Sequence, residues 1–440
     1  MIVRGGCGVQ LALFDFEVLS GRRLDVVGGS GIDLGDLFEA YYRCRANKRN
    51  TSNARAFEVD FETNLVQLWR EINCGAYVPR RSLAFIVGRP VQREIFAADF
   101  RDRVVHHLVI GKLNHLFERE FIYDSYSCRQ GRGTLFGVRR LDRFIRRCSQ
   151  QYTRDAYVLK LDISGFFMHI NRALLFDRLR WFVLKRYRGA DADALIELCR
   201  IIVFNDPTVD CVIRGRRSDW NGLPDSKSLF HSPVGCGLPI GNLSSQVFAN
   251  FYLNPFDHFV KHTLGVKYYG RYVDDMVFVH EDRKYLRALI DVVGAELKLN
   301  FGLDVHPKKI KLEHHRKGTP FLGAYIKPGR ITAGSRVKGN FFAAIEKHNS
   351  LPSEAMADVA IRGAVIASIN SYLGLLTHFQ TVRLRRAMLR RLHPAWWARL
   401  RVEGKAHKVV GRSRSQSASE RVKLTSANRR VDELGRDITQ

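Results

Sequence analysis

The sequence predicts an α+β protein in which short antiparallel strands are covered by helices. Two runs rich in β-branched and aromatic residues, 268–273 and 276–279, flank a pair of acids and predict a hairpin. Residues 157–163 predict a further, largely apolar strand. Helical periodicity is present in four longer stretches, residues 58–73, 172–203, 284–299 and 338–400. Strands joined by tight turns pair antiparallel, and amphipathic helices bury their apolar faces on such a sheet.

Three carboxylates mark the predicted active centre. Asp274 and Asp275 are adjacent in the hairpin turn, and Asp162 stands near the end of the strand 157–163. A hairpin turn normally uses Asp-Gly or Asn-Gly, and a carboxylate in an apolar strand is costly to bury alone. Hard oxygen ligands suit magnesium. An ordinary acidic turn is the alternative, but if the strand lies beside the hairpin, Asp162 and Asp274 can hold two metal ions between them.

Four segments resemble motifs of reverse transcriptases, and they follow that family's order. Tyr-Val-Asp-Asp at 272–275 resembles the palm hairpin, and Leu-Asp-Ile-Ser-Gly-Phe-Phe at 161–167 resembles the first catalytic strand. Gly-Leu-Pro-Ile-Gly-Asn-Leu-Ser-Ser-Gln at 237–246 resembles the segment beneath the incoming nucleotide. Phe-Leu-Gly at 321–323 resembles the primer grip. The resemblance extends over about residues 40–390.

This resemblance implies a right-hand polymerase fold with fingers, a palm that combines an antiparallel sheet with helices, and a helical thumb. The expected parts are an N-terminal appendage at 1–35, fingers at 36–155, palm at 156–335 with an insertion at about 204–230, thumb at 336–400, and a basic, flexible tail at 401–440. The implied activity is RNA-directed DNA synthesis, with Mg²⁺ or Mn²⁺ as cofactor and dNTPs as substrates. The implied partners are an RNA template and the cDNA product.

The resemblance also implies roles for single residues. The metal ions are expected against Asp162, Ile163, Asp274 and Asp275, of which the three aspartates are catalytic. Lys309 is expected to protonate the pyrophosphate, although a plain basic surface explains it nearly as well. The nucleotide site is expected to contain Arg93, Phe166, Phe167, Ile240, Gly241 and Gln246. The nucleic acid is expected to contact Arg129, Arg132, Phe321, Leu322 and Gly323.

Two of these residues predict substrate properties. Phe167, five residues after Asp162, can fill the space that a 2′-hydroxyl needs and so favour deoxynucleotides; alternatively, Phe166 and Phe167 both belong to the core. Ile240 stands where retroviral enzymes carry glutamine, and an aliphatic side chain cannot hydrogen-bond the nucleotide. This segment instead resembles bacterial reverse transcriptases of diversity-generating retroelements and of the defence-associated group. Reduced copying fidelity is therefore an expectation.

Composition favours a nucleic-acid partner. The chain has 71 Lys and Arg against 44 Asp and Glu, a net charge of +27 and a pI of about 10.1. Its eight cysteines form no Cys-x-x-Cys pair, which argues against a zinc site and suits a reducing compartment. No apolar run of membrane-spanning length and no signal peptide are expected. These features predict a cytoplasmic protein without a membrane partner.

The favoured biological role is that of a domesticated bacterial enzyme that copies an associated, structured non-coding RNA in antiphage defence. The chain is longer at both ends than a minimal mutagenic enzyme, and it shows no ribonuclease H-like cluster or His-Asn-His signature. The alternatives are a mutagenic reverse transcriptase of a diversity-generating retroelement, a non-catalytic RNA-binding scaffold, and non-templated nucleotide addition. An accessory protein or a homo-oligomer is left open.

Overall fold

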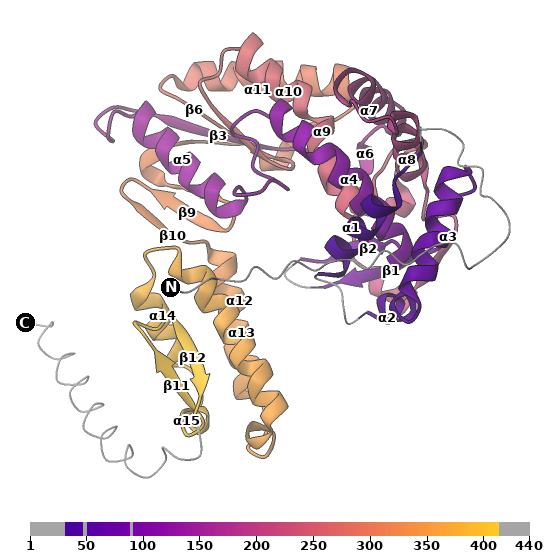
Figure 1. Ribbon diagram of the computed structural model, residues 1–440. Coiled ribbons are helices and arrows are strands. Elements are labelled where there is room, and N and C mark those ends of the chain that lie inside the picture. The colour runs from indigo at the N-terminus through magenta and orange to yellow at the C-terminus, as the bar shows by residue number, and fades with distance from the viewer. Residues whose placement is uncertain (1–30, 47–50, 89–90, 413–440) are drawn as a thin grey trace, which may run out of the picture.

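The computed structural model describes residues 31–46, 51–88 and 91–412 of the 440-residue chain (Figure 1). Most of the predicted N-terminal appendage, and the predicted tail beyond residue 412, lie outside the described residues. The first described helix, α1, spans Leu34–Arg45 and begins after Asp33, whose carboxylate accepts a hydrogen bond from the Gly35 backbone N–H. Such a cap satisfies one of the free N–H groups at the helix start.

A four-stranded antiparallel sheet forms the centre of the predicted palm. In spatial order its strands β5, β6, β3 and β7 span Tyr268–Tyr272, Asp275–His280, Tyr157–Asp162 and Lys311–His314. Side chains alternate between the two faces, so Leu159 and Leu161 join the main core while Val158 packs on the opposite face. The register pairs Asp162 directly with Asp275, which brings the two predicted catalytic segments together.

Helices cover both faces of this sheet (Figure 1). Six helices, α4 and α7 to α11, bury apolar side chains in the main core and span Phe100–Glu120, Arg172–Arg186, Ala192–Phe204, Leu243–Tyr252, Asn254–His258 and Arg283–Phe301. The other face is covered by α5, Thr134–Cys148. Its stripe of Val138, Leu141 and Ile145 is buried at helical spacing, as its amphipathic sequence predicts.

The predicted fingers combine three helices with a small sheet. Helices α1, α2 and α3 span Leu34–Arg45, Ser52–Glu58 and Phe61–Asn73. Residues 82–97 form a hairpin of β1, Ser82–Val87, and β2, Arg93–Ala97. Fingers and palm share one hydrophobic core, in which Leu37 and Val105 lie together with Phe248. Burial of common apolar surface therefore joins these two parts.

The segment 204–230, predicted as a loop-like insertion, contributes a strand to the fingers sheet instead. Its strand β4, Cys211–Ile213, pairs parallel to β1 in the order β2-β1-β4. The buried carboxylate of Glu94 on β2 accepts hydrogen bonds from Trp220 Nε1 at 2.7 Å and from Ser228 Oγ at 2.8 Å. A buried carboxylate requires such donors. Glu94 thus fixes the insertion against the hairpin.

The thumb has a core of its own around Phe341, Ile369 and Trp396. Its helices α12, α13, α14 and α15 span Ser335–Asn349, Val359–Thr377, Val382–Leu389 and Pro394–Trp397. The predicted helical thumb is therefore present over 336–400, and in Figure 1 it lies below the palm.

The prediction of a tail from residue 401 is wrong for 401–412. These residues form a hairpin of β11, Leu400–Glu403, and β12, Lys408–Gly411. The Asn370 side chain on α13 binds both the backbone N–H and the carbonyl of Val409 at 2.7 Å, and Val409 is fully buried. The hairpin is thus a packed part of the thumb.

Among the described residues, one helix has the length and composition of a membrane-spanning segment. It is α13, and 22% of its apolar window is buried. The prediction that no apolar run reaches this length is therefore wrong. The evidence for a span is weak, because core helices of soluble proteins meet the same criteria, and α13 packs Val365, Ile369 and Leu373 into the thumb core.

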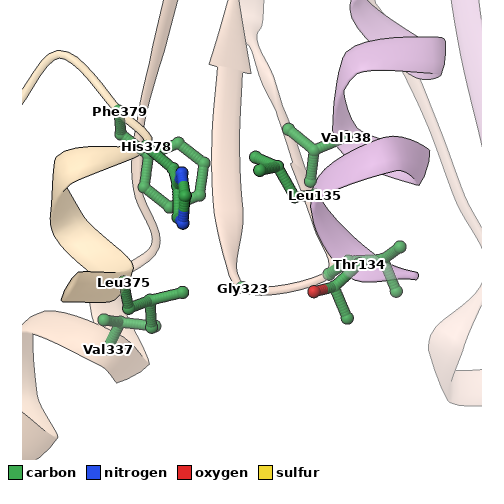
Figure 2. A pocket seen from close by; sticks show the side chains of 9 residues that line it. Thr134, Leu135, Val138, Gly323, Val337, Leu375, His378 and Phe379 are labelled. Carbon is green, nitrogen blue, oxygen red and sulfur yellow. The ribbon is translucent and has the colours of Figure 1, made fainter. Parts of the chain in front are cut away.

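A third sheet connects palm and thumb. Its strands β8, β9 and β10 span Thr319–Phe321, Ala324–Lys327 and Arg330–Ala333. A small, mostly apolar cavity of about 40 Å³ lies where the β8–β9 turn meets α5 and the thumb (Figure 2). It is lined by Thr134, Leu135, Val138, Leu322, Gly323, Val337, Leu375, His378 and Phe379. The cavity is therefore enclosed jointly by α5, the turn that carries the predicted primer grip, and the thumb.

Candidate active site

The β5–β6 hairpin presents the adjacent acids on a two-residue turn. Tyr272 pairs with Asp275, so Val273 and Asp274 are the two turn residues. Val273 has a φ of +56°, in the left-handed region that β-branched residues avoid. Such a conformation costs roughly 1–3 kcal/mol and persists only where the surroundings enforce it. Backbone strain is therefore concentrated at the position immediately before Asp274.

Three carboxylates lie within electrostatic reach of one another at this turn. Burial raises the pKa of Asp274 to about 7, and the charges of Asp275 and Asp162 add to the effect. Burial also raises the pKa of Asp275, against the opposing charge of Lys160. Burial is the main cause of both raised pKa values, and the like charges of the neighbouring carboxylates add to it.

Lys309 also lies at this centre. Its Nζ is 2.6 Å from Asp162 Oδ1, where it forms an ion pair. The His306 backbone N–H donates to the Asp162 carbonyl oxygen at 2.7 Å and ties the lysine-bearing segment to the end of β3. Of Lys308, Lys309 and Lys311, Lys309 is therefore the one that the fold brings into an ion pair with Asp162.

The donor chemistry of this centre fits Mg²⁺ or Mn²⁺. The carboxylate oxygens of Asp162, Asp274 and Asp275 are hard ligands, and a divalent cation would offset the charges of Asp275 and Asp162, which add to the effect of burial on the pKa of Asp274. Within the described ranges, no three or more acidic, histidine or cysteine side chains are already arranged to hold a metal ion, so the three carboxylates would have to close around it. Ile163 has its side chain in the core, so only its backbone carbonyl can serve as a ligand.

The two phenylalanines after β3 are placed differently. Phe166 is only 3% exposed and belongs to the main core, so its predicted contact with the nucleotide is wrong. Phe167 is half-buried, and its carbonyl accepts a hydrogen bond from the Leu238 backbone N–H at 2.8 Å. That bond brings the 237–246 segment next to Phe167. The sugar gate at Phe167 stays a prediction.

The 237–246 segment lies against the fingers strand β2. The Phe96 N–H donates to the Ile240 carbonyl at 2.8 Å, and Gly241 has a φ of +132°. A Cβ atom at Gly241 would lie 2.8 Å from Ile95 Cγ2, so the close approach requires glycine. Gln246 is exposed on α9.

Arg93 is exposed at the start of β2. Its charge acts to lower the pKa of Tyr272, a pKa that burial raises. Arg93 therefore lies within electrostatic range of the catalytic turn, as expected for a group that meets a triphosphate.

The two predicted template arginines have structural partners. Arg129 is buried, pairs with Glu118 at 2.9 Å, and donates to the Ile122 carbonyl at 2.7 Å. Arg132 donates to the Tyr123 carbonyl at 2.8 Å and stacks over that ring. Because all of Arg129's contacts are internal, the prediction that it binds nucleic acid is wrong. Arg132 is half-buried and keeps part of its surface free.

The predicted primer grip is a tight turn. Phe321 is 1% exposed and packs in the core beneath α5, so its side chain does not reach nucleic acid. Leu322 and Gly323 have φ values of +46° and +83° and form the turn itself. The Gly323 carbonyl accepts a hydrogen bond from the Gly334 N–H at 2.8 Å. Leu322 and Gly323 are thus the members of this motif that a primer can approach.

Two cations near the carboxylates were not predicted from the sequence. Lys160 is two residues before Asp162, on the same face of β3, and Arg336 is in the first turn of α12. Both oppose the burial that raises the pKa of Asp275. The alternation of strand faces could have identified Lys160. Nothing in the local sequence links Arg336 to the site, because it belongs to another domain.

Comparison with family models finds one match in the chain. The family model described as reverse transcriptase (RNA-dependent DNA polymerase) matches residues 92–326, just over half of the chain. A search of curated proteins finds no match.

Among solved structures, the chain is similar to telomerase from Candida albicans with a TWJ fragment of telomeric RNA, at 12% identity and a TM-score of 0.43, over 71% of this chain and 55% of that chain. It is also similar to apo telomerase from Candida tropicalis, at 12% identity and a TM-score of 0.41, over 71% of this chain and 60% of that chain. The chain thus spans less than two thirds of those proteins. The family match confirms the predicted α+β polymerase fold and identifies an RNA-directed DNA polymerase domain. The chain belongs to the reverse transcriptase family.

Proposed function

We propose that the protein synthesises cDNA on an RNA template by two-metal nucleotidyl transfer. The observation that supports this best is the juxtaposition of Asp162 with Asp275 and Asp274, with Lys309 against Asp162. Three carboxylates from two strands and one lysine form a centre that suits in-line transfer of a nucleotide to a primer hydroxyl.

Each residue then has a defined task. When bound by the carboxylates of Asp162, Asp274 and Asp275, the divalent cations supply charge for the attacking hydroxyl and the pyrophosphate. Lys309 lies where its ammonium can donate a proton to the leaving group. Arg93 meets the triphosphate from the fingers. Phe167 lies beneath the sugar and excludes a 2′-hydroxyl.

Charge supports an RNA template as the partner. A groove of about 570 Å³ between β10 and the start of α14 is lined by Arg330, Lys338 and Arg383, and no acidic side chain lines it. No ion pair to these three cations is present within the described ranges. Their positive charge is therefore available to backbone phosphates.

Primer extension tests this proposal. Purified protein, an RNA template with an annealed primer, dNTPs and Mg²⁺ should yield DNA whose sequence follows the template. Replacing one template base should change the nucleotide incorporated opposite it. Incorporation that ignores the template would support non-templated addition instead, and absence of incorporation with Mg²⁺ and Mn²⁺ would support the scaffold alternative.

For the biological role, we propose a cytoplasmic bacterial enzyme that copies an associated, structured non-coding RNA in antiphage defence. The proposal rests on the resemblance of the 237–246 segment to the defence-associated group and on the basic surface. Sequencing the nucleic acids that co-purify with the protein tests it. One recurrent structured RNA with its cDNA would support defence, whereas cDNA from a repeat beside a variable gene would support diversification.

A further inference from the structure

Strand β5 contains a buried charge, two residues before the catalytic turn, that the proposed chemistry does not use. Arg271 lies on β5 and is fully buried together with Asp257 of α10. Its Nε donates to Asp257 Oδ1 at 2.7 Å, and its Nη2 donates to Asp257 Oδ2 at 2.5 Å. Two parallel bonds fix the plane of the guanidinium. A buried ion pair is costly, so an apolar pair would be expected here if packing alone mattered.

The remaining nitrogen of this guanidinium reaches the strained turn. Arg271 Nη1 donates to the Val273 carbonyl oxygen at 2.9 Å. Val273 is the residue with a φ of +56°, and its carbonyl belongs to the peptide that leads into Asp274. The hydrogen bond therefore holds the peptide group between Val273 and Asp274. The orientation of this peptide sets the direction in which the Asp274 carboxylate points.

Arg271 is itself held from three sides. Its backbone N–H donates to the Asp124 carbonyl, and its carbonyl accepts from the Tyr126 N–H, both at 2.9 Å. Its Nη2 also donates to the Asn250 carbonyl on α9 at 3.3 Å. Every one of these partners is buried. The arginine thus joins α9, α10 and the 124–126 loop to the turn.

We propose that the Arg271–Asp257 pair is a positioning device that holds Val273 in its left-handed conformation and thereby aims Asp274 at the metal site. Arg271 touches no substrate, so its role is exerted through Asp274. This inference rests on the proposed function, because it presumes that Asp274 binds a cation. A flexible turn would lose conformational entropy each time a cation binds, whereas a fixed turn holds the carboxylate in the binding orientation before the cation arrives.

Arg271→Lys tests the device. Lysine keeps the charge, but one ammonium cannot reproduce a planar fork that reaches Asp257 and Val273 together. Mutation of a residue that orients a metal ligand typically lowers metal affinity or activity by about 10–100-fold. We expect Mn²⁺ binding, measured by calorimetry in the absence of substrates, to weaken by about tenfold, and kcat for extension to fall at least as much, with a KM for dNTP within about threefold.

Tyr269→Phe is the matched control. The Tyr269 hydroxyl donates to the same Asp257 Oδ1 at 2.7 Å and is equally buried, but among the described residues no hydrogen bond joins it to Val273 or Asp274. Its removal should lower the melting temperature while Mn²⁺ affinity and kcat stay within about twofold. If Arg271→Lys does not fold, Asp257→Asn takes its place. This substitution keeps the shape of the side chain but removes the anion that orients the guanidinium, and it should lower Mn²⁺ affinity and kcat in the same way.

The inference is overturned if folded Arg271→Lys or Asp257→Asn protein binds Mn²⁺ and extends primers like the wild type. It is equally overturned if Tyr269→Phe loses Mn²⁺ binding and primer extension to the extent that its melting temperature falls. The Arg271–Asp257 pair would then contribute only to packing. Failure of the proposed function looks different: the wild type itself would synthesise no DNA, while Mn²⁺ binding would still report on the turn.

Discussion

Asp274→Asn is predicted to stabilise the cation-free protein. In the folded chain the pKa of Asp274 is about 7, against 3.8 for an ordinary aspartate, because the carboxyl is buried beside Asp275 and Asp162. The pKa of Asp274 is higher in the folded state than in the unfolded state, so this carboxyl destabilises the fold least below about pH 4, where it is protonated in both states. Stability then falls as the pH rises towards 7 and stays low above it.

The magnitude follows from the shift. About three pKa units at about 1.4 kcal/mol each set a ceiling of about 4 kcal/mol at pH 8. Asp274 is only half-buried, and water and ions screen it, so we expect about 1–2 kcal/mol. For a protein of this size, at roughly 1 kcal/mol per degree, that corresponds to a rise in melting temperature of roughly 1–2 °C. At pH 5.5, about midway between the two pKa values, only about half of this destabilisation is present. The rise in melting temperature should therefore be about half as large.

Thermal unfolding in EDTA at the two pH values measures this gain. Asp291→Asn, on the exposed side of α11, is the control and should change nothing at either pH. Adding Mg²⁺ should raise the melting temperature of the wild type more than that of the variant. A lower melting temperature for Asp274→Asn at pH 8, or a gain that does not depend on pH, would refute the electrostatic reasoning.

Four further perturbations separate the roles assigned above. Phe167→Ala should raise the use of ribonucleotides relative to deoxynucleotides in single-nucleotide incorporation, whereas a purely structural Phe167 would lower both along with the melting temperature. Arg93→Ala should raise the KM for dNTP about tenfold without affecting stability, while Arg129→Ala should cost about 1–3 kcal/mol of stability and leave RNA affinity unchanged. Removing 413–440 should reduce the slope of log affinity against log salt, because fewer counterions are released on binding; an unaltered slope would show that these residues do not contact the RNA.

The catalytic hairpin could be predicted because its signals are local. Alternating apolar residues define β5 and β6, and two acids in the turn between them are chemically unusual. The pairing of Asp162 with Asp275 then follows from antiparallel register once the strand around Asp162 is identified. The strain at Val273 could not be predicted, because a β-branched residue rarely adopts the left-handed conformation and nothing in the alternation of apolar residues indicates it.

In other parts of the chain, the sequence did not indicate which groups the side chains and short strands contact. A glycine- and arginine-rich loop is typical of phosphate binding, yet Arg129 satisfies its donors on Glu118 and on nearby carbonyls. A three-residue strand such as β4 is too short to show alternation, and it is stabilised by pairing with β1. Residues 401–412 are polar by composition, and only the burial of Val409 against α13 shows that they are folded.

The measurement that tests the central claim most directly is primer extension by the Asp274→Asn, Asp275→Asn double variant. The account predicts a folded protein, with a melting temperature at least that of the wild type in EDTA, that still binds RNA but incorporates no dNTP with Mg²⁺ or Mn²⁺. Template-directed incorporation by this variant at a rate near that of the wild type would contradict the assignment of the metal site to the β5–β6 turn.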